Sequence, residues 1–224
     1  MQASKTRIFV VDDHPLIRDG LMLLINSEKD LEVCGTASGV ADAIQKLPQA
    51  APEVIIVDIT LRDGTGLDLI QRARQMLPQS KILVISHHDE RLYGERALRA
   101  GAMGYVNKEQ CEETILGAIR TVRAGKRHIS EELMQKLLTQ AIGQEDAQEP
   151  DSVARLTDRE LQVFGLIGEG LGTTQIAKKL HLSNHTIDSH RENIRRKLNL
   201  KNGHELTHAA VRWKLENENS SSAT

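Results

Sequence analysis

The sequence predicts two kinds of fold in one chain: a doubly wound α/β domain built on a five-stranded parallel sheet, and then a smaller all-α domain. From residue 7 to about residue 125, apolar runs alternate with segments of helical period. The runs are short, rich in β-branched residues and bounded by polar residues, as strands buried on both faces of a parallel sheet are. After residue 152 only helical periods remain, which indicates a separate helical domain.

Strands and helices are expected to alternate in the first domain. The strands are expected at 7–11, 31–36, 53–57, 81–85 and 103–106, and the helices at 15–27, 39–47, 66–76, 90–100 and 111–124. A further helix near 130–142 would begin with Ser130 as its N-cap and bury Leu133, Leu137 and Leu138. The polar, aperiodic stretch 143–152 that follows is typical of a linker.

The helical domain begins at a capping box, in which Thr157 and Glu160 each accept a hydrogen bond from the other's backbone N–H. Its helices are expected at 157–170, 173–180, 184–198 and 203–215. The tail, residues 216–224, is polar and serine-rich, and we expect it to be disordered. The predicted domains are therefore 1–127 and 153–215, joined by a helix and linker over 128–152.

Charge is divided unevenly along the chain, which has 224 residues and a net charge of −2. Residues 1–150 contain 18 lysines and arginines against 22 aspartates and glutamates, whereas residues 151–215 contain 11 against 7. An acidic half followed by a basic half favours a signalling domain joined to a nucleic-acid binder. Because Cys34 and Cys111 form no metal or redox spacing and no apolar run approaches the ~18 residues of a membrane span, we expect a cytoplasmic protein with no membrane partner.

Four charged residues lie where predicted strands end. Asp12 and Asp13 follow the first strand, Asp58 follows the third and Lys108 follows the fifth. The carboxyl ends of parallel strands share one edge of the sheet, where open α/β folds bind ligands, so these four side chains should converge. Three carboxylates in one cleft repel one another unless a cation lies between them, and oxygen ligands of this kind favour Mg²⁺. The sequence therefore predicts a Mg²⁺ cofactor and phosphoryl chemistry.

The same strand ends carry an ordered set of motifs. In chain order they are Val10-Val11-Asp12-Asp13-His14-Pro15, then Asp58 with Gly64 and Gly66 behind it, then Ser86, and finally Gly104-Tyr105 with Lys108. This set resembles a response-regulator receiver domain and covers about the first 125 residues. The resemblance implies a flavodoxin-like fold in which Asp58 is the phosphoacceptor and takes a phosphoryl group from a sensor histidine kinase.

The resemblance also implies the metal ligands and the switch residues. Asp13, Asp58 and the backbone carbonyl of Thr60 would bind Mg²⁺, with Asp12 reaching it through water. The residues that would sense the phosphate are Lys108, which pairs with it, Ser86, which hydrogen-bonds it, and Tyr105, which changes rotamer.

Two features depart from the family pattern or adjoin it. Leu61-Arg62 stands where many receivers have Met-Pro, which indicates a looser turn after the phosphoacceptor. His87-His88 follows Ser86 directly; these histidines could tune the active face electrostatically, but we expect them to be ordinary exposed loop residues.

Residues 173–198 carry a helix-turn-helix pattern, with a first helix over 173–180 and Ser183 as the N-cap of the second. The inner stripe of the second helix is formed by Ile187, Ile194 and Leu198. With Thr157-Asp158-Arg159-Glu160 upstream, this segment resembles the LuxR/NarL-type DNA-binding domain over about residues 153–215. A receiver followed by this domain is the layout of the NarL/FixJ class of transcription regulators.

This second resemblance implies that the second helix enters the major groove of double-stranded DNA. The candidate DNA contacts are Lys178, Asp188, Ser189, Arg191, Glu192, Asn193, Arg195, Arg196 and Lys197. Asp188 and Glu192 stand where several family members carry basic residues. Because carboxylates repel the DNA backbone, we expect weaker non-specific binding than in more basic relatives.

Together the resemblances imply a phosphorylation-controlled transcription regulator of a two-component system, and not an enzyme. A homodimer on DNA is expected because one helix reads few bases, and RNA polymerase is a further candidate partner. We hypothesise that the unphosphorylated receiver masks the DNA-binding domain. The alternative is a receiver-based signalling adaptor without a transcriptional role.

A zinc hydrolase is the rival enzyme hypothesis. His204, Glu205 and His208 match the H-E-x-x-H pattern, which places two histidines on one helical face with a glutamate as base. However, the 16 residues after His208 contain no histidine and no suitably placed glutamate to serve as a third ligand, and the same helix has a complete structural interpretation. Its apolar stripe, suited to packing or dimerisation, consists of Leu206, Ala209, Ala210 and Trp213.

Overall fold

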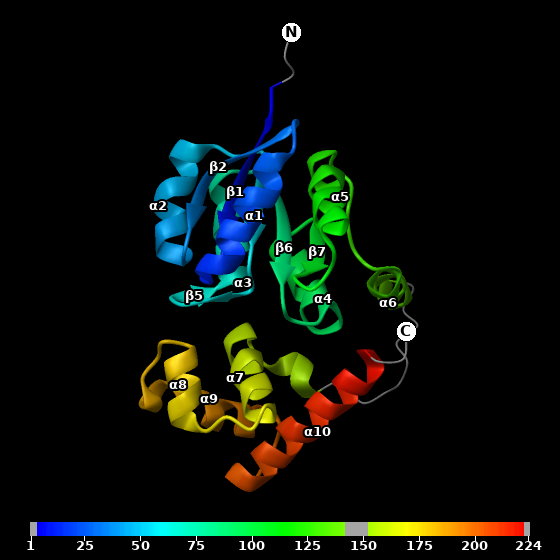
Figure 1. Cartoon of the computed structure of the whole chain (residues 1–224). Coiled ribbons are helices and arrows are strands. Elements are labelled where there is room, and N and C mark those ends of the chain that lie inside the picture. The colour runs from blue at the N-terminus through cyan, green and yellow to red at the C-terminus, as the bar shows by residue number, and fades with distance from the viewer. Residues whose placement is uncertain (1–3, 142–151, 222–224) are drawn as a thin grey trace. The chain divides into compact units, whose positions relative to one another are not determined.

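The computed structural model describes residues 4–141 and 152–221. The chain divides into two compact units, Met1–Gln144 and Glu145–Thr224 (Figure 1). The division falls inside the segment 128–152 that the sequence assigns to a helix and linker. Of the helices in the described ranges, none combines the length and the apolar character that crossing a membrane requires.

The first unit is built on a five-stranded sheet in the order β2-β1-β3-β6-β7, and every neighbouring pair is parallel. Its strands are β1 (Thr6–Val11), β2 (Leu31–Ala37), β3 (Val54–Val57), β6 (Lys81–Ser86) and β7 (Gly104–Asn107). This order is the doubly wound arrangement that the alternating pattern predicts. The predicted α/β fold and its five strands are therefore confirmed.

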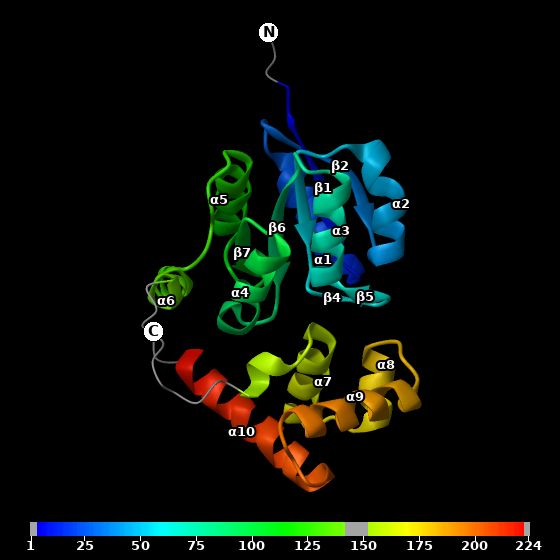
Figure 2. The ribbon, with the colours of Figure 1, turned by 180° about the vertical axis from the view of Figure 1, so that it is seen from behind.

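Helices cover both faces of this sheet (Figures 1 and 2). One face is covered by α1 (Pro15–Ser27) and α5 (Glu112–Arg123), and the other by α2 (Val40–Ala50), α3 (Gly66–Met76) and α4 (Glu90–Ala100). On the first face, Ile25 of α1 and Ile119 of α5 are fully buried against Val10 and Ile56 of the sheet. This apolar layer fixes the strands, and with them the residues at the strand ends.

Helix α2 is longer than the sequence predicts. It continues through Pro48 to Ala50, and the N–H of Ala51 closes it by donating to the carbonyl oxygen of Leu47 at 3.0 Å. A proline disfavours a helical conformation in the residue before it, which is why the predicted helix ends at residue 47. In a last turn, however, Pro48 costs little more than one backbone hydrogen bond.

A short hairpin of β4 (Thr60–Leu61) and β5 (Gly64–Thr65) follows Asp58, and the sequence does not predict it. Strands of two residues are too short to show alternation. The hairpin is tied to the fold at both sides. The Asp63 carboxylate accepts the N–H groups of Val40 and Ala41 at 2.7 and 2.8 Å, and the Thr65 hydroxyl caps α3.

Helix α6 (Glu131–Ala141) packs on α4. Ser130 is its N-cap, as predicted, because its hydroxyl accepts the N–H of Leu133. Leu133 is buried and Leu137 is half-buried, but Leu138 is 54% exposed, so its predicted burial is wrong. Adjacent helical residues point about 100° apart, and only one of the two leucines can face α4.

The second unit is helical throughout. It contains a 3-10 turn η1 (Ser152–Arg155) and the helices α7 (Asp158–Gly168), α8 (Thr173–Lys179), α9 (Asn184–Lys197) and α10 (Gly203–Ser221). Helix α10 ends at Ser221 and so overlaps the tail 216–224, for which we expect disorder, while 222–224 lie outside the described residues. Polarity suggested disorder, but residues 216–221 contain neither the glycine nor the proline that would end a helix.

The core of this unit lies where α7 meets α9 and α10. Phe164 of α7 is buried, and its ring centroid lies 5.4 Å from that of Trp213. Ile187 and Ile194 of α9 are fully buried, which confirms the inner stripe of the second helix, whereas Leu198 is half-buried. Ser183 caps α9 as predicted, since its hydroxyl accepts the N–H of Thr186.

Gly66 is required at the start of α3. A Cβ at this position would lie 2.0 Å from the backbone oxygen of Asp58. We expect Gly66→Ala to destabilise the first unit by about 1–3 kcal/mol or more, because the backbone beside Asp58 must shift. In the matched control, Gly117→Ala in α5, the added methyl meets no atom within 4 Å and should stabilise the helix by about 0.5–1 kcal/mol. Calorimetric unfolding measures both, and equal effects would contradict this.

Glu160 links the capping box to α9 and gives the second unit a pH-dependent stability. Its carboxylate accepts the N–H of Thr157 and the ammonium of Lys197, at 2.7 and 2.6 Å. Burial alone would raise the pKa of Glu160, but these hydrogen bonds outweigh burial and hold the pKa below its ordinary value.

An unfolded glutamate titrates near pH ~4.3. Because the pKa of Glu160 is lower in the folded unit, its ionised form stabilises the fold above about pH 4.3, and this stability is lost as the pH falls through the folded-state pKa. We expect Glu160→Gln to lower the free energy of unfolding at neutral pH and to flatten its dependence on pH in acid, measured by urea unfolding. Glu192→Gln, which removes an exposed ion pair with Arg195, is the control and should lower the free energy of unfolding at neutral pH less than Glu160→Gln does.

Candidate functional site

The ends of four strands of the sheet bring the predicted site residues to one edge. Asp58 follows β3, and its N–H donates to the carbonyl oxygen of Val11 at the end of β1. Lys108 follows β7, and its N–H donates to the carbonyl oxygen of Ser86 at the end of β6. Each hydrogen bond is 2.9 Å long. The sheet's own hydrogen bonding therefore sets the positions of these backbones.

Lys108 joins two of the three carboxylates. Its Nζ lies 2.6 Å from Asp12 Oδ2 and 2.6 Å from Asp58 Oδ2, and its side chain is only 2% exposed. Burial would lower the pKa of Lys108, but the two carboxylates outweigh burial and raise it. Lys108 is therefore a fixed positive charge at the centre of the site.

Asp58 is held from two sides. One carboxylate oxygen accepts Lys108, and the other accepts the Ser86 hydroxyl at 2.8 Å. Both Asp58 and Ser86 are buried. The structure thus places a hydroxyl and an ammonium within hydrogen-bond distance of one carboxylate, from three different strands.

Asp13 is the carboxylate with the fewest contacts. Asp12 accepts the N–H of His14 in addition to Lys108, but Asp13 Oδ1 is buried without a hydrogen-bond partner. It lies 2.9 Å from Nδ1 of His14, in a geometry that does not form a hydrogen bond. Burial raises the pKa of Asp13, the charge of His14 opposes this, and Asp58 and Asp12 raise it further.

These residues fit a hard divalent cation. Oxygen atoms of Asp12, Asp13 and Asp58 and a ring nitrogen of His14 lie within 4.8 Å of one another. Lys108 pairs with Asp12 and Asp58, and the half-exposed guanidinium of Arg62 lies 3.6 Å from Asp13, so the three carboxylates still outnumber the permanent positive charges beside them. An unpartnered Asp13 oxygen beside two further carboxylates is a donor set of the kind that Mg²⁺ prefers.

His88 is a site residue that the sequence reasoning missed. It was expected to be an exposed loop residue, but it is half-buried, and its Nε2 lies 2.7 Å from the Thr60 hydroxyl. Its backbone carbonyl accepts the hydroxyl of the buried Tyr105 at 2.8 Å, and its ring lies 4.7 Å from the ring of Tyr93. No signal in the local sequence could have found this contact, because it joins residues 28 positions apart.

The helix-turn-helix of α8 and α9 presents a polar face. None of the candidate DNA contacts is fully buried. The exposed ones are Lys178, Asp188, Ser189, Glu192 and Arg196, and the half-buried ones are Arg191, Asn193, Arg195 and Lys197. Asp188 accepts the Thr173 hydroxyl at 3.3 Å. The face therefore displays both signs of charge, as the sequence indicates.

Several cations of α9 are engaged within the protein. Arg195 donates to Glu192 at 2.7 Å and to the backbone carbonyl oxygen of Lys201 at 2.6 Å. Lys197 is held by the buried carboxylate of Glu160. Lys197 thus has a structural role, the ion pair with Glu160 that joins α9 to α7, which we do not predict from the sequence.

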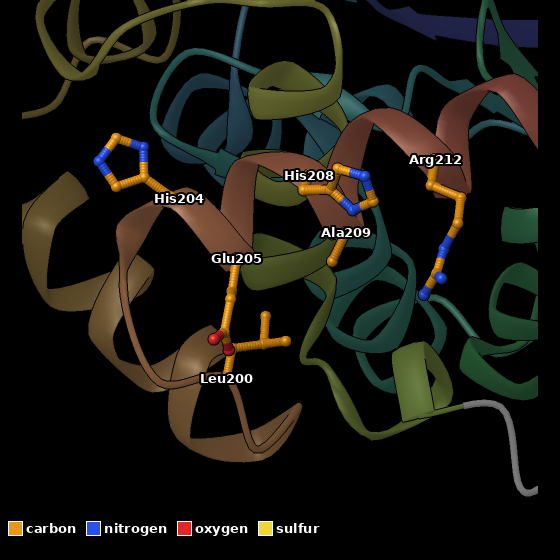
Figure 3. A pocket seen from close by; sticks show the side chains of 6 residues that line it. All are labelled: Leu200, His204, Glu205, His208, Ala209 and Arg212. Atoms are coloured by element: carbon orange, nitrogen blue, oxygen red, sulfur yellow. The ribbon is translucent and has the colours of Figure 1, made fainter.

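The H-E-x-x-H residues are not among the groups of three or more His, Cys, Asp or Glu that could hold a metal in the described part of the chain. His204, Glu205 and His208 line an open pocket of about 350 Å³ with Leu200, Ala209 and Arg212. Figure 3 shows the Glu205 side chain directed toward Leu200, away from both imidazole rings. Its carboxylate accepts the N–H of Lys201 at 2.7 Å. Within the described parts of the chain, the cluster able to hold a metal is the one around Asp13.

Comparison with known proteins agrees with both units. Residues 8–120 match the response regulator receiver domain, and residues 154–210 match the bacterial regulatory proteins of the luxR family. The chain is 34% identical over 213 residues to the oxygen regulatory protein NreC of Staphylococcus carnosus, an alignment that covers 93% of this chain and 98% of NreC.

Solved structures share the fold. A LuxR-family two-component response regulator from Aurantimonas sp. is 29% identical, with a TM-score of 0.57 over 62% of this chain and 99% of that one. The RcsB response regulator of Salmonella typhimurium is 24% identical, with a TM-score of 0.64 over 94% of this chain and 98% of that one. A second structure of RcsB, from Salmonella enterica serovar Typhimurium, is bound to the promoter rprA in the presence of the phosphomimetic BeF3⁻. It is 24% identical to this chain, and the superposition has a TM-score of 0.60 over 92% of this chain and 98% of the RcsB chain.

The strand-end cluster thus lies in the region that matches the receiver family, and the helix-turn-helix lies in the region that matches the luxR family. Together the two regions cover most of the chain. The alignment with NreC covers 93% of this chain and so extends over both matched regions. The chain belongs to the response regulators that join a receiver domain to a LuxR-type DNA-binding domain, and it is a phosphorylation-controlled transcription regulator.

Proposed function

We propose that Asp58 is the phosphoacceptor and that a sensor histidine kinase supplies the phosphoryl group. The observation that carries this is the geometry around Asp58, a buried carboxylate held between Lys108 and Ser86 and adjacent to Asp13. An Asp58 oxygen forms the new bond to phosphorus, the bond from phosphorus to the donor histidine's nitrogen breaks, and its electron pair stays on the imidazole.

We further propose that Asp13, Asp58 and the Thr60 carbonyl bind Mg²⁺, with Asp12 reaching it through water. The unpartnered oxygen of Asp13 supports this assignment. Bound there, Mg²⁺ would neutralise charge on the attacking and transferred oxygens and orient them. Lys108 would remain as the protein's own positive charge beside the new phosphate, which adds about −1.5 to −2 charge.

The signal would leave the site through Ser86 and Tyr105. In this structure the Ser86 hydroxyl donates to Asp58, and the Tyr105 hydroxyl donates to the carbonyl of His88. A phosphoryl group on Asp58 offers Ser86 a new acceptor, so Ser86 would move with the loop that carries His88. Tyr105, buried on β7, would then change rotamer.

The phosphoacceptor assignment predicts the effect of one substitution. Asp58→Asn should abolish labelling by acetyl phosphate with Mg²⁺, because an amide oxygen is too weak a nucleophile. The control is Asp68→Asn, an exposed aspartate in the first turn of α3, which should label like the wild type. Phosphate-affinity electrophoresis measures both. Labelling of the Asp58→Asn variant at the wild-type level would remove Asp58 from this role.

We propose that α9 reads the major groove of double-stranded DNA and that two copies of the chain bind as a homodimer. The polar face of α9 supports this, and a dimer would double the few bases that one helix contacts. RNA polymerase is a candidate partner at the promoter. A cytoplasmic location follows from action on the chromosome and agrees with two free cysteines, Cys34 and Cys111.

The mixed charge of the DNA-binding face predicts a moderate salt dependence. Asp188 and Glu192 are exposed beside the basic residues, and Lys197 is held by Glu160. We expect the plot of log Kobs against log salt concentration to have a slope shallower than about −8. Glu192→Lys should steepen the slope by about 1 through one more phosphate contact. Fluorescence anisotropy on non-specific duplex DNA measures both slopes, and a wild-type slope of about −8 or steeper would contradict the expectation.

A further inference from the structure

Arg62 reaches across the site to Asp13. It lies in the turn between β4 and β5, the position where the sequence departs from the Met-Pro of many receivers. Its Nη2 donates to the backbone carbonyl oxygen of Asp13 at 3.1 Å, and its Nε lies 3.6 Å from Asp13 Oδ2. The Arg62 side chain is 52% exposed, whereas that of Asp13 is 12% exposed. The half-exposed guanidinium of Arg62 thus contacts Asp13, which has fewer hydrogen-bond partners than the other two carboxylates of the cluster.

The backbone that carries Arg62 is anchored on both sides. Asp63 accepts two N–H groups at the start of α2, and the N–H of Gly66 donates to the carbonyl oxygen of Ile59 at 2.7 Å. The guanidinium is therefore presented to Asp13 from a fixed hairpin. Its contact with Asp13 joins the hairpin to the end of β1, two segments 49 residues apart.

The other cations of the cluster have different tasks. Lys108 pairs with Asp12 and Asp58 at 2.6 Å. His14 lies beside Asp13, but its charge depends on protonation. Arg18, on α1, donates at 2.8 Å to the backbone carbonyl of Asp12 rather than to a carboxylate. Within the described ranges, Arg62 is thus the permanently charged side chain placed on the carboxylate of Asp13.

A guanidinium and a divalent cation that share one carboxylate oppose each other. Each is attracted to the same oxygens, and like charges a few ångströms apart repel. We propose that Arg62 is an internal competitor for Mg²⁺ at Asp13: it compensates the carboxylate when the metal is absent, and metal binding must displace it. The inference rests on the proposed metal site. In this role Arg62 tunes the metal affinity through Asp13. The contact between the hairpin and Asp13 then depends on whether the metal is bound.

The competitor role is tested by Mg²⁺ affinity, measured by isothermal titration calorimetry on the full chain. At low ionic strength, Arg62→Gln should bind Mg²⁺ about threefold or more tightly than the wild type, because one opposing charge is gone. Since the side chain is half-exposed, the difference should shrink at about 0.5 M salt. Arg62→Lys keeps the charge and should stay close to the wild-type affinity.

The matched control is Arg18→Gln, which removes the same charge from the same edge of the sheet without touching the Asp13 carboxylate. It should change the Mg²⁺ affinity less than Arg62→Gln does. Unchanged or weaker binding by Arg62→Gln, an equal gain in Arg18→Gln, or an equal gain in Arg62→Lys would each overturn the competitor role. Asp13→Asn separates the two proposals. If the wild type binds Mg²⁺ and Asp13→Asn does not, the metal site stands whatever Arg62 does; if the wild type and Asp13→Asn bind Mg²⁺ alike, the site itself is wrong.

Discussion

The two short bonds from Lys108 to Asp12 and Asp58 are the constraint on which the receiver site depends. Three carboxylates at one sheet edge would otherwise repel one another in a poorly solvated place. A buried ammonium is tolerated there because two carboxylates raise its pKa, and the carboxylates are tolerated because the ammonium is there. This mutual dependence leaves Asp13 outside the pairing with Lys108, and the guanidinium of Arg62 lies 3.6 Å from its carboxylate.

Much of this could be predicted from the sequence because strand ends in a parallel sheet share one edge. The runs ending at Asp12, Asp58 and Lys108 predicted the topology and the cluster together, and Thr157 with Glu160 predicted the start of α7. The misses have a common physical reason. The β4–β5 hairpin is too short to show a period, and the contacts of His88 and Arg62 join segments 28 and 49 residues apart. No local pattern encodes contacts between side chains so distant along the chain.

The loops around Asp58 act as one connected layer. Thr60 contacts His88, the His88 carbonyl holds Tyr105, and Arg62 holds Asp13. Thr60 and Arg62 both lie in the β4–β5 hairpin, and His88 lies in the loop that follows β6. These contacts therefore join the loop after β3 to the loop that leads into α4, the helix on which α6 packs.

The contact between the tilted rings of Trp213 and Phe164 has a practical consequence for following this molecule in solution. The chain has one tryptophan, and its ring lies in the helical unit, between α7 and α10. The indole emission belongs to a residue of the helical unit, while the receiver contributes its tyrosines. A phosphodonor that alters this emission in the intact chain has changed the surroundings of a residue outside the receiver, so the protein carries its own optical probe of communication between its halves.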